Sequence, residues 1–253
     1  MGVNDMNSTA TDSMPHIDVS VVVPVHDEAG AAVVLAYDIA KAFEGWSYEM
    51  IFVNDASRDD TLSLLQAAKK ELPHLRVLSH ATNAGQSRAV RSGVLAARGD
   101  IVVTLDGDGQ NPAHDAPRLA KTLMEAPVSV GLVGGRRVKR QDSEAKRQAS
   151  LWANRIRKKL LNDDADDTGC GLKALRRQVF VQLPYFDHFH RYLPALVLRE
   201  GFENRYLDVD HRHRETGQSK YTNWGRLKAS LSDLLGVMWL KSRARSAGAV
   251  REV

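Results

Sequence analysis

The sequence has 253 residues, 43% of them hydrophobic, and one cysteine, Cys170, so it can bury the core of an α/β domain but excludes an intramolecular disulfide and a multi-cysteine zinc site. Its net charge of +4 is modest, yet ten Lys or Arg residues against two acidic ones lie between 136 and 159, which indicates a phosphate-bearing partner or an anionic membrane surface. Residues 1–16 lack the apolar run of a secretory signal, and no stretch approaches the roughly 20 apolar residues of a membrane span, so we expect a disordered tail and a cytoplasmic protein.

Strands and helices alternate through the first half of the chain. Ile17 to Val25 is β-branched and almost continuously apolar, which is typical of a strand buried on both faces of a parallel sheet. The alternation predicts a mainly parallel sheet with helices on both faces, in which ligands bind beyond the carboxyl ends of the strands. Further strands are expected at 48–53, 75–79, 100–105 and 128–133, with helices at 31–43, 58–72, 86–97 and 117–125.

After residue 134 the pattern changes to a basic helix, an acidic loop at 163–167 and short elements between 171 and 183. A helix at 190–200 and a last strand at 203–210 follow. From Trp224 to Trp239 the apolar residues fall on one helical face that Lys and Arg residues flank. Such a helix can lie in a membrane interface or dock on protein, and the sequence leaves both open.

Two carboxylates separated by one residue follow the strand at 100–105. Mg²⁺ and Mn²⁺ prefer hard oxygen ligands together with phosphate oxygens, so Asp106 and Asp108 can hold such a cation against a diphosphate. On its own, an Asp-Gly-Asp sequence is more often a polar surface turn. Asp55, at another strand end, can accept hydrogen bonds from a base or ribose, or can cap the next helix.

The chain contains four motifs: Val22 to Glu28, Val53 to Thr61, Asn83 to Gly85 with Arg88 and Gly93, and Leu105 to Pro112. In order and spacing they resemble the family-2 glycosyltransferases. The resemblance covers roughly residues 17–225 and implies a GT-A type fold, a UDP- or GDP-sugar donor and inversion at the anomeric carbon. His26 stands where the family often has an aromatic residue, and Asn54 precedes Asp55 where it often has two aspartates.

The resemblance assigns roles on the donor side. It implies that the first motif holds the nucleotide and that Asp55 reads the base or ribose. Arg88 is expected either to meet the donor phosphates or to lie on a solvated helix face. The nucleotide-binding candidates are Pro24, His26, Glu28, Asp55, Arg88, Asp106 and Gln110, and the candidate ligands of Mg²⁺ or Mn²⁺ are Asp106, Asp108 and Gln110.

Residues 167–173 and 211–221 resemble the branch of the family that transfers sugars to polyprenyl phosphate, such as dolichol-phosphate mannose synthases and bacterial undecaprenyl-phosphate sugar transferases. The usual arginine of that branch appears here as Lys173. A phosphomonoester already carries a nucleophilic oxyanion at neutral pH and needs no strong general base. The candidate phosphate-binding residues are Arg136, Lys173, Arg214, Ser219 and Lys220, and the catalytic candidates are Asp108, Asp167 and Arg212.

We therefore predict a metal-dependent, inverting hexosyltransferase that moves a sugar from a UDP- or GDP-sugar to polyprenyl phosphate at the inner face of the cell membrane, for cell-envelope glycan or lipid A modification. A glycosyltransferase with a glycan, lipid A or protein acceptor and a non-catalytic nucleotide-sugar-binding module are the alternatives. Nucleic acid is not expected, because no aromatic residues interleave the basic ones, and a homo-oligomer is left open.

The predicted organisation is a tail at 1–16, a GT-A domain at 17–221 and a helix with a basic tail at 222–253. Within the domain, 17–134 forms the nucleotide-sugar half and 135–221 the acceptor half. Asp167 is expected either to orient the acceptor or to balance nearby basic residues. We expect Cys170 to be a packing residue, and His188 and His190 to be surface or packing residues.

Overall fold

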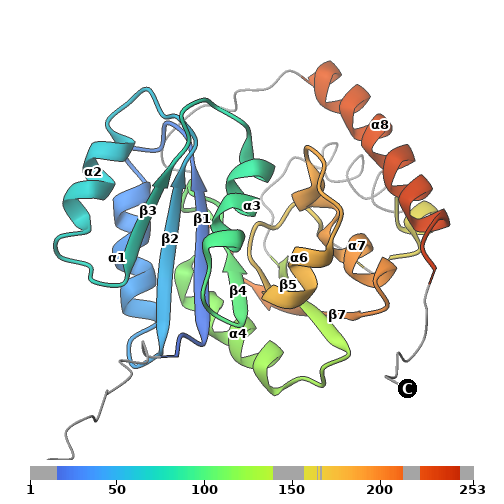
Figure 1. Cartoon of the computed structure of the whole chain (residues 1–253), viewed down its shortest axis with the longest axis horizontal. Helices are drawn as coiled ribbons and strands as arrows, with labels where there is room; N and C mark the ends of the chain where they lie inside the picture. Colours follow the sequence, from blue (N-terminus) through green and yellow to red (C-terminus); the bar gives the residue numbers. More distant parts are fainter. Residues whose placement is uncertain (1–15, 139–156, 164, 166, 213–222, 246–253) are drawn as a thin grey trace, which may run out of the picture.

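A computed structural model describes residues 16–138, 157–163, 165, 167–212 and 223–245, with the backbone alone for residues 223–230. One mixed sheet runs through the molecule in the order β3-β2-β1-β4-β6-β5-β7 (Figure 1). β1, β2, β3 and β4 are parallel to one another, while β6 runs antiparallel to both β4 and β5. The strands are β1 (Val19–Val25), β2 (Tyr48–Asn54), β3 (Leu75–Ser79), β4 (Ile101–Thr104), β5 (Val130–Arg137), β6 (Lys173–Arg176) and β7 (Glu203–Val209).

Helices cover both faces of this sheet and make a three-layer α/β/α fold (Figure 1). Side chains of α1, α2 and α4 pack in one hydrophobic core, and those of α3, α6, α7 and α8 pack in the other. The helices are α1 (Ala32–Ala42), α2 (Thr61–Ala68), α3 (Gln86–Ala96), α4 (Ala116–Glu125), α6 (Arg177–Gln182), α7 (Leu193–Arg199) and α8 (Asn223–Ser242), with single 3₁₀ turns η1 (Ala113–Asp115) and η2 (Phe189–Arg191).

The alternation of side chains along β1 explains why that strand is apolar throughout. Val19, Val21 and Val23 belong to the first core and Val22 to the second, because successive residues of a strand point to opposite faces. Every residue of β1 is buried. The sheet therefore has no solvent-facing surface here, and only its strand ends are available to a ligand.

A buried polar network closes the opposite, amino-terminal edge of the sheet. Glu49 on β2 is 4% exposed and accepts hydrogen bonds from Ser20 at 2.7 Å and Arg76 at 2.6 Å. Burial by itself would raise the pKa of Glu49, but these hydrogen bonds, together with one from the backbone N–H of Arg98, hold it below its usual value. Glu49 is therefore a stabilising carboxylate on the side of the sheet away from the ligand-binding edge.

The structure confirms the strands and helices expected in the first half of the chain, with two differences. α2 begins at Thr61 because Asp59 accepts the backbone N–H of Thr61 at 3.0 Å and so ends the preceding turn. The larger difference is β6, which the chain inserts between β4 and β5, so that strands of the expected donor and acceptor halves are interleaved in one sheet.

α8 docks on the domain along one side and exposes apolar residues on the other. Val237 is fully buried in the second core, whereas Leu231, Leu235 and Trp239 are each about 60% exposed. Figure 1 shows α8 along the edge of the molecule beside α7. Within the described ranges, every helix is too short or too polar to cross a lipid bilayer.

Candidate active site

Three polar clusters meet at the carboxyl edge of the parallel strands. The register pairs the end of β1 with the end of β2, and β4 lies on the other side of β1. The backbone N–H of Asp55 donates to the carbonyl of Val25 at 2.8 Å, and His26 Nδ1 lies 2.9 Å from the carbonyl oxygen of Asp55. The expectation that the motif residues gather at one edge is confirmed, which is where parallel sheets bind ligands.

The loop that follows β1 is fixed by the loop that follows β2. Thr61 Oγ1 accepts the backbone N–H of Glu28 at 2.9 Å, and Asp27 accepts the backbone N–H of Arg58 at 2.7 Å. Asp27 and Ala56 both adopt left-handed backbone conformations, with φ of 54° and 55°. Such conformations are costly for a residue like Ala and persist where surrounding contacts hold them, as the hydrogen bonds between the two loops do here.

Asp55 organises the third motif. Its carboxylate is buried and accepts hydrogen bonds from the backbone N–H groups of Ala84 at 2.9 Å and Gly85 at 2.7 Å, while His80 Nδ1 lies 2.7 Å away. Gly85 precedes α3 with a φ of 85°, which favours glycine. Asp55 thus holds the loop before α3, and its role in reading a base or ribose stays a prediction.

Asp106 and Asp108 lie on the turn after β4. Asp106 accepts a hydrogen bond from Gln86 on α3 at 2.8 Å, and Asp108 accepts the backbone N–H of Gln110 at 3.1 Å. Burial, followed by the charge of Asp108, raises the pKa of Asp106 to about 6, against the opposing effect of Lys173 and Arg137. The charge of each carboxylate therefore acts on the other, and a cation bound between them would relieve that repulsion.

Two glycines allow this turn to pack closely against its neighbours. A Cβ on Gly171 would lie 2.2 Å from the carboxyl group of Asp106, and a Cβ on Gly107 would lie 2.6 Å from the carbonyl oxygen of Pro24. The residues therefore fit a divalent cation: Asp106 and Asp108 offer hard oxygen atoms, and Gln110 follows them on the same turn.

A second group of possible oxygen and nitrogen ligands lies at the start of α4. Donor atoms of His114, Asp115 and Asp210 all lie within 4.8 Å of one another. Asp115 already accepts the guanidinium of Arg118 at 3.0 Å and the backbone N–H of Asp210 at 2.9 Å. These bonds explain the cluster without an ion.

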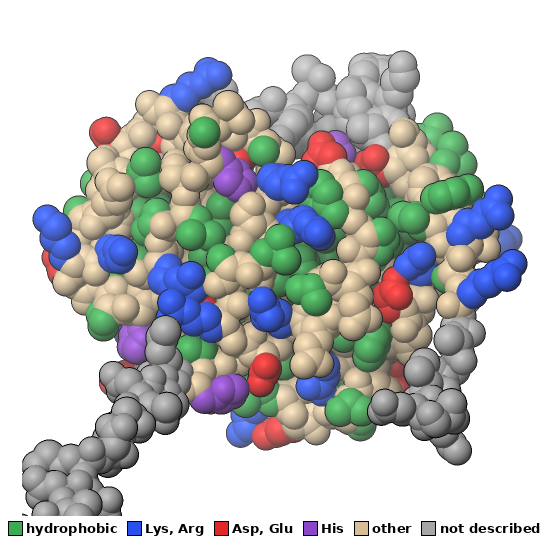
Figure 2. Space-filling view, viewed as in Figure 1, with side chains coloured by type: hydrophobic (Ala, Val, Ile, Leu, Met, Phe, Trp, Pro, Cys, Tyr) green, Lys and Arg blue, Asp and Glu red, His purple; other side chains and the backbone are tan. Residues whose placement is uncertain are grey.

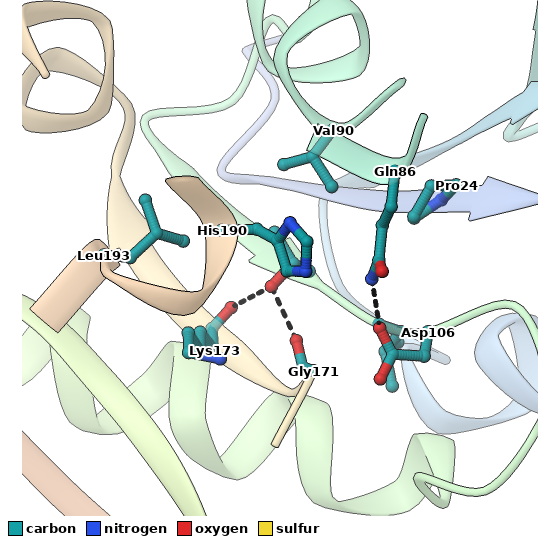
Figure 3. Close-up of a pocket in the computed structure, with 10 residues that line it drawn as sticks. Pro24, Gln86, Val90, Asp106, Gly171, Lys173, His190 and Leu193 are labelled. Atoms are coloured by element: carbon teal, nitrogen blue, oxygen red, sulfur yellow. Dashed lines mark hydrogen bonds between the residues drawn. The ribbon is translucent and has the colours of Figure 1, made fainter. Parts of the chain in front are cut away.

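A narrow pocket opens beside Asp106 and reaches across the sheet to α7 (Figure 3). Lys173, at the start of β6, is 4% exposed and donates to the carbonyl of Cys170, and burial lowers the pKa of Lys173. Thr104 donates to the carbonyl of Gly171 at 2.7 Å, which joins β4 to the loop before β6. The lining residues are Pro24, Gln86, Val90, Thr104, Leu105, Asp106, Gly171, Lys173, His190 and Leu193.

Three of the charged side chains expected on the acceptor side form ion pairs within the protein. Asp167 is buried and forms two hydrogen bonds, of 2.6 and 2.7 Å, with the guanidinium of Arg137. Arg136 pairs with Asp208 at 2.6 Å. Arg212 places its side chain 3.3 Å from Asp38 on α1, while its backbone N–H donates to the carbonyl of Gln110.

Other residues that the sequence singled out have contacts elsewhere in the protein or lie outside the described part. Arg88 stacks its guanidinium on the ring of Tyr185, 4.2 Å from the ring centroid. Cys170 is buried, as expected of a packing residue. Arg214, Ser219 and Lys220 lie outside the described residues.

Sequence reasoning missed Gln86, Gly171 and His190 as site residues. Gln86 bonds to Asp106, Gly171 makes room for that carboxylate, and His190 lines the pocket rather than serving only as a surface or packing residue. The sequence signal for Gly171 was its place in the 167–173 motif. His190 carried no signal, because it reaches the pocket from a short turn far along the chain.

Comparison with known proteins gives a consistent result. Residues 20–183 match the family described as Glycosyl transferase family 2. The undecaprenyl-phosphate 4-deoxy-4-formamido-L-arabinose transferase of Shewanella sediminis is 35% identical over 206 residues, which are 80% of this chain and 61% of that protein. The protein of the same name from Photorhabdus laumondii is 34% identical over 81% of this chain and 63% of its own. The chain thus spans about three fifths of the length of these curated relatives.

Solved structures of low sequence identity share the fold. Glucosyl-3-phosphoglycerate synthase from Mycobacterium tuberculosis, in complex with UDP, aligns with a TM-score of 0.65 at 18% identity over 92% of this chain and 82% of that one. A mannosyltransferase from Pyrobaculum calidifontis, in complex with GDP-mannose and Mn²⁺, aligns with a TM-score of 0.62 at 19% identity over 91% of this chain and 65% of that one. Both comparisons support the three-layer fold.

Proposed function

This chain belongs to glycosyltransferase family 2, and from that premise we propose that it transfers a sugar, with inversion, from a UDP- or GDP-sugar to polyprenyl phosphate. The observation that carries the proposal is the carboxylate pair Asp106 and Asp108 at the carboxyl edge of the sheet, next to the pocket that contains Lys173. The curated relatives carry the name of undecaprenyl-phosphate sugar transferases. We propose that the reaction serves the modification of lipid A or of a cell-envelope glycan.

On the donor side, the protein binds and orients the nucleoside diphosphate part of the nucleotide sugar. The loops after β1 and β2, which His26 and Asp55 join, receive the nucleoside, and the turn after β4 receives the diphosphate. A divalent cation, Mg²⁺ or Mn²⁺, held by Asp106 and Asp108 would stabilise the negative charge that develops on the leaving nucleotide. Gln86 positions Asp106 for this role through the 2.8 Å hydrogen bond.

On the acceptor side, the protein supplies positive charge rather than a strong base. A phosphomonoester has its second pKa near 6 and is already a nucleophile at neutral pH. Lys173 and Arg137 both lower the pKa of Asp106, so their positive charges act on the region where the two substrates meet. We assign Lys173 to the acceptor side, while Asp167 orients Arg137 through its two hydrogen bonds.

α8 supports contact with a membrane surface, where polyprenyl phosphate resides. Leu231, Leu235 and Trp239 recur every four residues and form one exposed apolar stripe, and Arg243 and Arg245 are exposed near its end. Figure 2 shows apolar and basic side chains next to each other on this edge of the molecule. Such a stripe suits peripheral binding to an anionic bilayer, and we propose the inner face of the cell membrane.

The test is a transfer assay with membranes, Mn²⁺ and radiolabelled nucleotide sugar, in which wild-type protein should place label in an acid-labile, solvent-extractable lipid. Asp108→Asn keeps the size of the side chain but removes its charge, and should lower transfer by about 100-fold or more. Asp100→Asn makes the same change at the opposite end of the same strand and should leave transfer unchanged.

Each other outcome identifies an alternative. Label that enters only glycan, lipid A or protein would show a different acceptor. Tight, metal-dependent nucleotide binding without any turnover would show a non-catalytic binding module. Full activity of Asp108→Asn would refute the metal assignment.

A further inference from the structure

We propose that His190 is a specificity-determining residue whose Nε2–H donates a hydrogen bond to a hydroxyl oxygen of the donor sugar, in the pocket beside Asp106. This inference rests on the proposed function and goes beyond it, because it assigns the sugar itself to the space between α3, β6 and α7. Figure 3 shows the imidazole directed into that space, with Lys173 on one side and Gln86 and Asp106 on the other.

The ring of His190 is held in place by the turn that carries it. His190 is the middle residue of η2, and the preceding Phe189 is fully buried. The ring of Phe189 contacts those of Phe180, Tyr185 and Phe186, with centroids 5.4 to 6.4 Å apart. A turn anchored by this aromatic cluster presents the imidazole in one orientation.

The partner of His190 settles which ring nitrogen carries the proton. Nδ1 lies 2.7 Å from the hydroxyl oxygen of Ser87 on α3, and Ser87 is fully buried. A buried hydroxyl must donate its hydrogen, and in the described part of the chain Nδ1 is the acceptor within reach of Ser87. Ser87 therefore donates to Nδ1, so the proton of the imidazole is on Nε2.

His190 is neutral throughout the physiological range. Burial lowers the pKa of His190 to about 3, and the positive charges of Arg191, Lys173 and His188 act in the same direction. Among the described residues, Nε2 has no hydrogen-bond acceptor. The protein thus places a neutral N–H group in the pocket with its hydrogen bond left for a ligand.

Two other polar side chains of the pocket already have a partner within the protein. Gln86 donates to Asp106, and Lys173 donates to the carbonyl of Cys170. The remaining walls are largely apolar, contributed by Pro24, Val90, Leu105 and Leu193.

A pocket with apolar walls and a neutral N–H donor, beside the proposed metal-binding carboxylate, suits a sugar ring, which has C–H faces and hydroxyl groups. Lys173 is the residue of this pocket that we assign to the acceptor phosphate, whereas the neutral N–H of His190 has no charge that would match a dianion. The geometry therefore favours the sugar of the donor over the phosphate of the acceptor as the ligand of His190.

The experiment compares binding of sugar-free and sugar-bearing nucleotides by calorimetry in Mn²⁺. UDP-glucose, UDP-glucuronic acid and GDP-mannose are measured against UDP and GDP, and the nucleotide sugar that wild-type protein binds most tightly is used for the variants. His190→Ala should weaken binding of that nucleotide sugar by about 3- to 10-fold, which corresponds to one neutral hydrogen bond. The affinity of the same variant for the sugar-free nucleotide, UDP or GDP, should be unchanged. His190→Gln, which keeps an N–H donor, should recover part of the loss.

A neighbouring histidine provides the matched control. His188 lies in the same turn with a φ of 62° and pairs with Asp233, and it does not line the pocket. Asparagine suits that backbone conformation, so the His188→Asn variant should bind the nucleotide and the nucleotide sugar as tightly as wild type does. Thermal unfolding of each variant separates a local effect from loss of the fold.

Three results would overturn the inference. Equal weakening of nucleotide and nucleotide sugar in His190→Ala would show a role that does not involve the sugar. An unchanged donor affinity together with a higher KM for a short-chain polyprenyl phosphate would place the acceptor phosphate at His190. A ¹H–¹⁵N spectrum with the imidazole proton of His190 on Nδ1 would refute the donor geometry. If wild-type protein bound none of the nucleotide sugars, the proposed function itself would fail and this inference with it.

Discussion

Replacing Gly171 by alanine should disable the site without unfolding the protein. The added Cβ would lie 2.2 Å from both Cγ and Oδ2 of Asp106, whereas ordinary contact begins near 3.4 Å, so the carboxylate must move by about 1.2 Å. Asp106 can do so by rotating its side chain, which costs little. The rotation would break its hydrogen bond from Gln86 and remove one oxygen from the proposed metal site.

The size of the effect follows from that displacement. A shift of about 1 Å in a positioned catalytic group lowers rates by roughly 100-fold, and we expect a loss of that order in sugar transfer. Affinity for UDP should fall in Mn²⁺ and change little in EDTA. The thermal midpoint should stay within about 4 °C of wild type, because the change in unfolding free energy is about 1 kcal/mol.

Gly236→Ala is the control for Gly171→Ala. It adds the same methyl group where a Cβ would meet no atom within 4 Å. Calorimetric titration of UDP into both variants, with Mn²⁺ and with EDTA, separates the metal-dependent effect from any other. Wild-type affinity of Gly171→Ala in Mn²⁺ would refute the reasoning, since it would mean that Asp106 is not needed where the structure places it.

Three further predictions concern stability. Gly93→Ala puts a Cβ 2.4 Å from Val22, inside a packed core, and should lower the thermal midpoint by about 4–8 °C; an unchanged midpoint would mean that α3 can shift. Asp55→Asn removes an acceptor from a buried carboxylate that holds three donors and should cost about 1–3 kcal/mol in urea unfolding, whereas a smaller loss would show that the loop is held by other contacts. Glu49 has a lowered pKa in the folded state. Its contribution to the free energy of unfolding is therefore present above its unfolded pKa of about 4.5 and is lost as the pH falls through its folded-state pKa. Glu49→Gln should therefore be about 2 kcal/mol less stable at pH 7, with a gap that narrows below about pH 4, and a gap independent of pH would contradict this sign.

The sequence was sufficient to predict the sheet edge that carries the site. Val19 to Val25 is apolar on both faces because both faces are buried, and the polar residues that follow it, such as His26, must then lie at the strand end. Asp106 and Asp108 were expected there for the same reason. The local pattern of apolar and polar residues is sufficient for this prediction, since it shows which residues of a strand are buried and where the strand ends.

Contacts between distant segments were not predictable in the same way. Arg136 was expected to bind phosphate and Arg212 to act in catalysis, but the sequence does not say that Asp208 and Asp38 lie within reach of them. His190 likewise reaches the pocket only because η2 packs against α3, which no local pattern specifies. Charge and residue type indicate which interactions a side chain can form, whereas the fold determines which residues it contacts.

The position of β6 determines how this protein can be altered. β6 carries Lys173 and forms hydrogen-bonded ladders with both β4 and β5, so the segment that we assign to the acceptor side is also part of the structure that supports Asp106. A chimera that joined residues before 135 to the second half of a relative would have to rebuild two strand interfaces at once. Changes in acceptor preference are therefore more readily made by single replacements in loops and at strand ends than by exchange of modules.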